Sequence, residues 1–329
     1  MDQTNKKRLK IGVVMDPIDS INPKKDTSLA LMLEAQARGH QVAYLEMKDL
    51  FILDGEAKGK LTWVKLFDSQ SKWYEVQSQE EASLGDLDVI LMRKDPPFDI
   101  EFIMSTYILE LAEAQGVLVV NKAQSLRDVN EKVFTAWVPQ CCPSSILTRS
   151  KERLKEFLKK HQKIVVKPTG KMGGQSIFVI AEGDINTNVI LEEITRKETE
   201  YVQAQAYIPE IETKGDKRII LINGEPIPYG ITRIPSKGDH RGNLAVGAKA
   251  EGFKLTDRDL WICRQLGPIL KEKGLIFVGI DVIGDYLTEI NVTSPTGIKE
   301  IDHFFSTNCA AEFYSCIEEI VSNSKTKLS

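Results

Sequence analysis

Asp281, Glu289 and Asn291 lie on two short, largely apolar strands that the sequence predicts between Gly279 and Pro295. Glu289 and Asn291 alternate with apolar residues, which is the period of two expected for a strand with one polar face. Carboxylate and amide oxygens are hard donors, and so small a set leaves room for water and phosphate oxygens around Mg²⁺. Asp281, Glu289 and Asn291 are therefore a candidate magnesium site facing a phosphate ligand. The alternative is a solvated edge hairpin with ordinary polar residues.

Whether Asp281 can act together with Glu289 depends on the turn that joins the two predicted strands. A two-residue loop pairs Asp281 with Thr288 and turns it away from Glu289. A three-residue loop from Gly284 to Tyr286 places Asp281 directly opposite Glu289. We expect the odd-length loop or an equivalent bulge.

A glycine-rich turn follows Lys167, between two predicted strands. Gly173 and Gly174 would let backbone amides approach an anion, and Lys167 would project from the strand end. The turn is not a Walker A loop, because Val165 and Met172 occupy positions where that motif needs glycine and Ser or Thr. The alternative is a flexible hairpin turn without a ligand.

Several cations could serve the same phosphate chemistry. Arg218, Arg233 and Arg241 could neutralise charge on a transferring phosphoryl group, and they could equally form salt bridges at a rim. Arg93 and Asp95 adjoin paired prolines, an arrangement that suits a small carboxylate-bearing zwitterion. The alternative there is a solvated loop with a rigid turn. Lys132, considered alone, is typical of a surface lysine.

Composition limits the class of protein. With 329 residues and 42% hydrophobic content, the chain can form two or three domains with a sizeable core. A net charge of -4 gives no general attraction to nucleic acid. Five cysteines without CxxC spacing argue against disulfides and for a reducing cytosol, and four scattered histidines argue against zinc. No apolar run is long enough for a signal peptide or membrane span, so we expect a soluble protein without a membrane partner.

The elements that must position these residues fall into three groups. Strands predicted at 9–15, 41–47, 88–92 and 117–120 alternate with helices at 26–38 and 99–115, which indicates a parallel α/β layer. No GxGxxG follows the first strand, so a dinucleotide fingerprint is missing. The loops at 16–26 and 93–98 thus become candidates for holding another ligand.

The rest of the chain predicts a small α+β module from residue 145 and then a third unit. In the third unit, Asn223-Gly224 predicts a tight hairpin, and Thr256 with Asp259 predicts a capping box opening a helix to Lys273. Residues 235–252 are rich in glycine and charge and predict a long flexible loop. We expect domains at 1–124, 125–206 and 207–329.

The order of these features, together with several local stretches, resembles the bacterial glutathione synthetases of the ATP-grasp superfamily. The stretches are residues 15–18, 24–28, 91–99, 121–137, 241–244 and 289–296, within a resemblance that runs from Ile11 to Ile301. It implies an ATP-grasp fold, α/β and α+β, with an N-terminal Rossmann-like parallel domain. It also implies a cytoplasmic homotetramer that joins γ-glutamylcysteine to glycine through an acyl phosphate, using ATP and Mg²⁺ or Mn²⁺.

The same resemblance implies roles for individual residues. Lys132 and Lys167 would contact the nucleotide phosphates, and Arg218 and Arg241 would stabilise the phosphoryl and carboxylate groups. The remaining nucleotide contacts would be Gly173, Gly174, Gln205, Ala206, Tyr207, Ile208 and Asp216. The substrate contacts would be Asp16, Lys25, Arg93, Asp95, Arg233 and Asn243. Residues 235–252 would act as a lid, because an acyl phosphate hydrolyses unless water is excluded.

One departure and three rival interpretations accompany this resemblance. The family's glycine-rich turn usually reads Gly-Met-Gly-Gly, whereas here Lys171 precedes Met172. The enzyme rivals are other ATP-grasp carboxylate-amine ligases, such as a D-alanine ligase or a glutamate-adding protein modifier; the segment Arg93–Asp99 and the predicted loop containing Arg241 argue against both. A third rival is a nucleotide-binding regulatory module without turnover, which retention of the metal acids disfavours.

Overall fold

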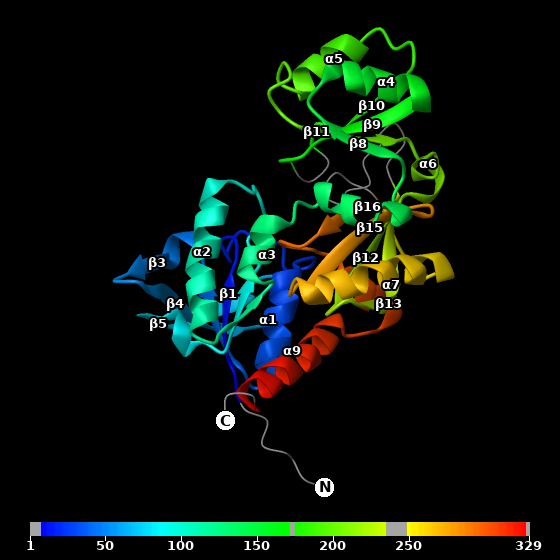
Figure 1. The fold of residues 1–329 in the computed structure, drawn as a ribbon. Coiled ribbons are helices and arrows are strands. Elements are labelled where there is room, and N and C mark those ends of the chain that lie inside the picture. Colours follow the sequence, from blue (N-terminus) through cyan, green and yellow to red (C-terminus); the bar gives the residue numbers. More distant parts are fainter. Residues whose placement is uncertain (1–7, 172–174, 235–248, 327–329) are drawn as a thin grey trace.

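The computed structural model describes residues 8–171, 175–234 and 249–326, which form three sheets with helices packed against them (Figure 1). None of the helices in these ranges has the length and apolar character needed to cross a membrane. The α/β and α+β arrangement expected from the sequence is confirmed.

The N-terminal sheet has the strand order β3-β4-β2-β1-β6-β7, with β5 paired to β4. Its parallel part is the predicted layer: β1 (Lys10–Val14), β2 (Gln41–Leu45), β6 (Val89–Met92) and β7 (Leu118–Val120). The helices are α1 (Thr27–Ala37), α2 (Ile100–Ala114) and α3 (Ala123–Asp128). The side chain of Asp26 caps α1 by accepting a hydrogen bond from the Leu29 amide at 2.6 Å.

An antiparallel extension of this sheet was not predicted. It consists of β3 (Leu50–Leu53), β4 (Glu56–Leu66) and β5 (Tyr74–Ser83). Most residues of β5 are exposed, so its sequence carries little of the burial pattern from which strands are recognised. Short 3₁₀ turns lie before β3 at Met47–Asp49, after β5 at Leu84–Asp86, and after α3 at Val133–Trp137 and Pro139–Cys141.

The small module is an antiparallel sheet in the order β10-β9-β11-β8. Its elements are β8 (Ser145–Thr148), α4 (Lys151–His161), β9 (Lys163–Pro168), β10 (Phe178–Ala181), α5 (Thr187–Ile194) and β11 (Val202–Ala206). Figure 1 shows α4 and α5 on the outer side, with the sheet facing the body of the molecule. Val166 and Ala204 belong to the core under the helices, so their strand neighbours face the opposite way.

The third sheet has the order β14-β13-β12-β15-β16 and carries the predicted metal strands. Its elements are α6 (Ile211–Lys214), β12 (Asp216–Ile222), β13 (Glu225–Ile234), β14 (Lys249–Lys254), α7 (Asp257–Glu272), β15 (Phe277–Ile283), β16 (Tyr286–Asn291), α8 (Ile298–Phe305) and α9 (Cys309–Thr326). The prediction of a loop to residue 252 was wrong at its end, because Lys249–Lys254 pairs with β13. Residues 235–248 lie outside the described ranges.

Two local predictions in this unit are confirmed. Asn223 and Gly224 form the tight hairpin turn, with φ of 48° and 77°. A Cβ on Gly224 would lie 2.6 Å from the Gly267 carbonyl oxygen, so the turn also needs glycine for close packing. Thr256 and Asp259 form the capping box, since the Thr256 hydroxyl accepts from the Asp259 amide at 3.2 Å and Asp259 Oδ2 accepts from the Thr256 amide at 3.0 Å.

Asn121 fastens the third sheet to the N-terminal one. Its amide nitrogen donates to the carbonyl oxygens of Phe277 at 2.8 Å and Val292 at 2.6 Å, and its Oδ1 accepts from the Phe277 amide at 2.8 Å. The side chain is buried, which strengthens these bonds. The start of β15 and the end of β16 are thereby fixed beside β7.

Candidate active site

The hairpin of β15 and β16 brings Asp281 directly opposite Glu289. The loop itself has two residues, because Ile283 pairs with Tyr286, so the three-residue alternative is not formed. Instead the register shifts after Asp281, and Thr288 becomes the extra residue of a bulge. The Thr288 hydroxyl donates to the Asp281 carbonyl oxygen at 3.1 Å. The expectation of an odd-length loop or an equivalent bulge is thus confirmed through the bulge.

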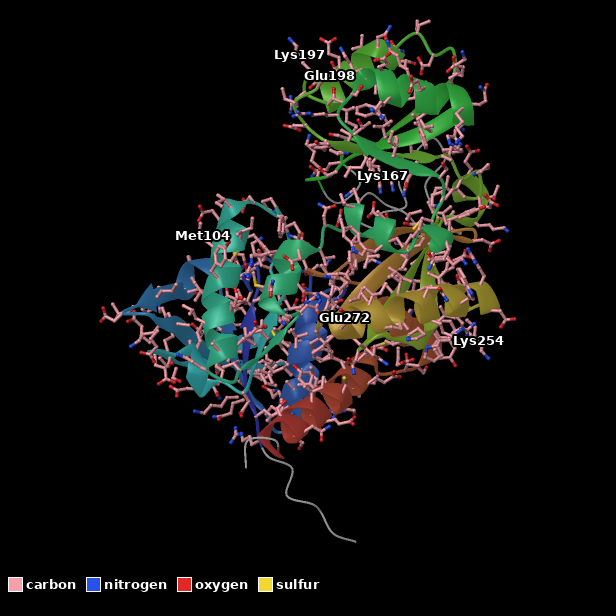
Figure 2. All side chains as sticks on the ribbon, viewed as in Figure 1. Met104, Lys167, Lys197, Glu198, Lys254 and Glu272 are labelled. Carbon is pink, nitrogen blue, oxygen red and sulfur yellow. The ribbon has the colours of Figure 1, made fainter. Side chains whose placement is uncertain are left out.

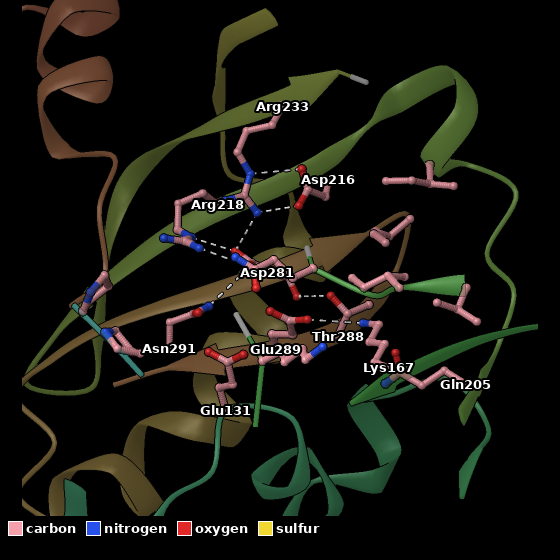
Figure 3. Close-up of a pocket in the computed structure, with 18 of the residues that line it drawn as sticks. Glu131, Lys167, Gln205, Asp216, Arg218, Arg233, Asp281, Thr288, Glu289 and Asn291 are labelled. Carbon is pink, nitrogen blue, oxygen red and sulfur yellow. Dashed lines mark hydrogen bonds and ion pairs between the residues drawn. The ribbon is translucent and has the colours of Figure 1, made fainter. Parts of the chain in front are cut away.

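The Asp281 carboxylate is buried among hydrogen-bond donors (Figure 3). Oδ1 accepts from Arg218 Nε at 2.6 Å and lies 3.0 Å from Arg233 Nη2. Oδ2 accepts from Arg218 Nη2 at 3.1 Å and from the Asn291 amide at 3.3 Å. Burial acts to raise the pKa of Asp281, but Arg218 and Arg233 outweigh it and hold that pKa well below its usual range.

Asp216 completes a chain of alternating charges. It accepts from Arg233 Nε at 3.0 Å and also pairs with Arg233 Nη2, so Arg233 bridges Asp216 and Asp281. Burial raises the pKa of Asp216, against the opposing effect of Arg233. The structure therefore directs Arg218 and Arg233 toward buried acids, although both also line the cavity described below.

Two lysines face the hairpin from the small module and its connection. Lys167, on β9, points at the body of the molecule (Figure 2), and its Nζ lies 3.4 Å from Glu289 Oε1. Lys132 is almost completely buried; its amine pairs with the Glu131 carboxylate and donates to the Lys171 carbonyl oxygen at 2.9 Å.

Glu131 is a site residue that the sequence reasoning missed. Its carboxylate is 7% exposed and lines the same cavity as Glu289. Burial raises its pKa to about 7, with help from Glu289 and against the opposing effect of Lys132. Its position next to Lys132 was the available signal.

These residues surround a cavity of about 630 Å³ between the small module and the third sheet (Figure 3). One end carries the charged groups Glu131, Lys167, Asp281 and Glu289. The other end is lined by the apolar side chains Val165, Ile177, Val179, Ile208, Ile211 and Ile283, beside Gln205, Ala206 and Tyr207. The amide nitrogen of Gln205 is buried and has no hydrogen-bond partner among the described residues. An apolar end with a spare donor and a charged end with cations suit a nucleotide base and its phosphates.

The residues predicted for a substrate on the N-terminal side are only partly brought together. Asp16 Oδ2 accepts from the Asp95 amide at 2.9 Å, and Asp95 lines the cavity. Arg93 is buried behind it, donating to Ser28 Oγ at 3.2 Å and the Pro295 carbonyl oxygen at 2.9 Å, while its Nη1 has no partner in the described part of the chain. Burial lowers the pKa of Arg93 to about 10. Lys25 is exposed on the loop before α1.

Four predicted residues cannot be placed. Gly173 and Gly174 lie in 172–174, and Arg241 and Asn243 lie in 235–248, all outside the described residues. Lys171 does line the cavity, and its amine lies 3.1 Å from Ser176 Oγ across the glycine-rich turn.

The donors fit a divalent cation that also takes ligands from phosphate and water. No group of three or more His, Cys, Asp or Glu side chains able to hold a metal is found within residues 8–171, 175–234 and 249–326. Asp281 and Glu289 supply two carboxylates and Asn291 an amide oxygen, a set too small for a closed protein cage. Because the Asp281 carboxylate already accepts hydrogen bonds from three side chains, the oxygens of Glu289 and Asn291 are more available as metal ligands.

Comparisons with known families agree with this geometry. Residues 9–127 match the family model described as the prokaryotic glutathione synthetase N-terminal domain, and residues 131–306 match the ATP-grasp domain of the same family. A glutathione synthetase of Escherichia coli is 54% identical over 310 residues, covering 94% of this chain and 98% of its own. One of Coxiella burnetii is 52% identical, covering 94% and 96%.

Solved structures show the same fold at low sequence identity. The D-cycloserine synthetase DcsG has a TM-score of 0.68 at 12% identity, covering 94% of this chain and 99% of its own. D-alanyl-alanine synthetase A of Vibrio cholerae has a TM-score of 0.60 at 12% identity, covering 97% and 99%.

Proposed function

The chain belongs to the prokaryotic glutathione synthetase family, and we propose that the cavity between its small module and third sheet is the active site. The chain is an ATP-dependent ligase that joins γ-glutamylcysteine to glycine, giving glutathione, ADP and phosphate. One observation carries the assignment of the cavity. Asp281 and Glu289 face each other across the bulge, and Lys167 reaches within 3.4 Å of Glu289 from the opposite module.

ATP would lie along the cavity, with its base at the apolar end. The unpartnered Gln205 amide and the backbone of Ala206, Tyr207 and Ile208 are the groups available to the base. The phosphates would lie toward Lys167 and Lys132, because ammonium groups are effective point charges for phosphate. Gly173 and Gly174 would add backbone amides. Asp216 would act indirectly, by holding Arg233.

Glu289, Asn291 and Asp281 would hold Mg²⁺, with Mn²⁺ a second candidate. A bound divalent cation would draw charge from the phosphate oxygens, which favours attack on the γ-phosphorus and departure of ADP. Arg218 and Arg233 balance the charge of Asp281 and so reduce its repulsion of the neighbouring acids Glu131 and Glu289.

The chemistry is two displacements in sequence. A carboxylate oxygen of the cysteinyl group bonds to the γ-phosphorus, and the bond from that phosphorus to ADP breaks. The glycine amine then attacks the acyl carbon, the acyl–phosphate bond breaks, phosphate leaves, and the amine loses a proton. Arg218 and Arg241 would stabilise negative charge in both steps, and the loop containing Arg241 and Asn243 would exclude water.

The dipeptide would lie toward the N-terminal sheet. Asp16 and Asp95 are adjacent there, so their carboxylates could receive the amino group of the γ-glutamyl moiety. Arg93 would act from behind with its unpartnered Nη1, Arg233 from the third sheet and Lys25 from the exposed loop.

The domain boundaries at 1–124, 125–206 and 207–329, a homotetrameric assembly and a cytoplasmic location complete the proposal. The family supports the last two as expectations, and sedimentation velocity measures the assembly directly.

An acceptor panel tests the activity. The protein is incubated with Mg·ATP, γ-glutamylcysteine and one amino acid at a time, and ADP release is measured. Robust release with glycine is expected. If ADP release did not depend on glycine but increased with D-alanine or glutamate, the result would favour the rival carboxylate-amine ligases.

A further inference from the structure

The buried amine of Lys132 has a dedicated counter-charge in Glu131. Lys132 is 2% exposed and Glu131 is 7% exposed, and their charged groups are in direct contact. A buried ammonium without a partner is strongly disfavoured, so the carboxylate lets Lys132 remain charged in this position. Burial acts to lower the pKa of Lys132, but Glu289 and Glu131 outweigh it and raise that pKa.

The backbone around this pair is fixed from two sides. Gln203 of the small sheet donates from its amide to the Lys132 carbonyl oxygen at 2.9 Å. The Ile290 amide of β16 donates to the Glu131 carbonyl oxygen at 2.9 Å. Asn130 Oδ1 accepts from the Lys132 amide at 3.1 Å. The remaining freedom of Lys132 is in its side chain, whose end is held by Glu131 and the Lys171 carbonyl oxygen.

This arrangement leaves one donor of the amine available. A lysine ammonium has three donors, and two of them are used by Glu131 and by the Lys171 carbonyl oxygen, 2.9 Å away. Glu131 itself lines the cavity, with Lys132 directly behind it. Lys132 is not itself a lining residue, so a phosphate would reach its third N–H past Glu131, at the charged end of the cavity.

We propose that Glu131 is a positioning residue that holds the Lys132 amine, charged and oriented, for the nucleotide phosphates. This inference rests on the proposed function, because it assumes that ATP occupies the cavity. Glu131 acts through Lys132 and takes no proton from the substrates. Without its carboxylate, the amine would turn toward Glu289, another acid that raises its pKa.

The test measures binding of the ATP analogue AMPPNP with Mg²⁺ by titration calorimetry, and steady-state KM and kcat. Glu131→Gln should weaken AMPPNP binding about tenfold, the loss expected for one hydrogen bond to a charged group. The KM for ATP should rise similarly, while kcat at saturating ATP and the KM for glycine change less than about twofold. Glu131→Asp, which keeps the charge, should retain most of the affinity and keeps the test usable if the glutamine variant folds poorly.

Two controls separate positioning from a general structural effect. Glu110→Gln makes the same change in the ion pair between Arg127 on α3 and Glu110 on α2, outside the cavity, and should leave AMPPNP binding unchanged. In a Lys132→Met background, Glu131→Gln should have no further effect on binding. The inference would be overturned if Glu131→Gln bound AMPPNP as tightly as the wild type or more tightly. It would also be overturned if Glu131→Gln lost as much AMPPNP affinity in the Lys132→Met background as in the wild-type background. Failure of the wild-type protein to bind AMPPNP would instead overturn the proposed function.

Discussion

Replacing Asp281 with asparagine should destabilise the protein even when no metal or nucleotide is present. Asp281 is the acceptor shared by Arg218 and Arg233, with contacts of 2.6, 3.1 and 3.0 Å. Asparagine removes the charge and turns a donor toward one of these guanidinium groups. Arg233 keeps Asp216, whereas Arg218 keeps only the Thr296 carbonyl oxygen at 3.0 Å among its described partners.

The magnitude follows from the burial of Arg218, which is 6% exposed. Breaking a buried pair by removing one partner costs about 3–5 kcal/mol. Because only one of the two arginines loses its sole acid, we expect about 3 kcal/mol. For a chain of this size each kcal/mol lowers Tm by about 2 °C, so the expected shift is about 6 °C.

The assay measures thermal unfolding by scanning calorimetry in buffer containing EDTA. The matched control is Glu75→Gln, which breaks the Lys72–Glu75 pair of 2.5 Å, whose side chains are 62% and 51% exposed. An exposed pair contributes less than about 1 kcal/mol, so its Tm should stay within about 2 °C of the wild type. An Asp281→Asn protein as stable as this control would refute the assignment of Asp281 as the electrostatic centre of the third sheet.

Three further predictions concern the site and the pH dependence of stability. Lys167→Met should raise the KM for ATP about tenfold, because a charge-assisted contact with phosphate is lost; an unchanged KM in initial-rate assays would remove Lys167 from the phosphate site. Glu289→Gln should lower glycine-dependent ADP release about 100-fold, and undiminished release would show that the metal assignment is wrong. Burial lowers the pKa of His40 despite its contact with Glu318 at 3.2 Å, so the folded protein favours neutral His40. The unfolded chain then binds the proton more readily, and stability should fall as pH drops below about 6.5, by at most about 1.4 kcal/mol per pH unit. His40→Gln should flatten this dependence in urea denaturation between pH 5 and 7.5, and an unchanged slope would exclude His40 as its source.

Features encoded within a few residues could be predicted from the sequence. The turn at Asn223 and Gly224 and the capping box at Thr256 each depend on side chains no more than three residues apart. The alternation around Glu289 placed the acid and Asn291 on one face of β16. Residues two apart on a strand point to the same face, so local spacing is enough to predict that the two side chains lie together.

Features set by pairing between distant segments could not be predicted. Arg218 lies opposite Asp281 in the β12–β15 register, and the two are 63 residues apart in the chain. Local sequence patterns therefore could not predict their ion pair. The bulge at Thr288 was foreseen only as one of two alternatives, because either connection brings Asp281 to Glu289. Glu131 was missed because its significance comes from β16 and the small module, which approach it only in the folded chain.

The central claim is that ATP activates the γ-glutamylcysteine carboxylate as an acyl phosphate within this cavity. Its most direct test uses γ-glutamylcysteine labelled with ¹⁸O in the cysteinyl carboxylate, together with Mg·ATP and glycine, and mass spectrometry of the products. The mechanism predicts glutathione together with phosphate that carries one ¹⁸O for each peptide bond formed. Phosphate without label, released alongside glutathione, would contradict it.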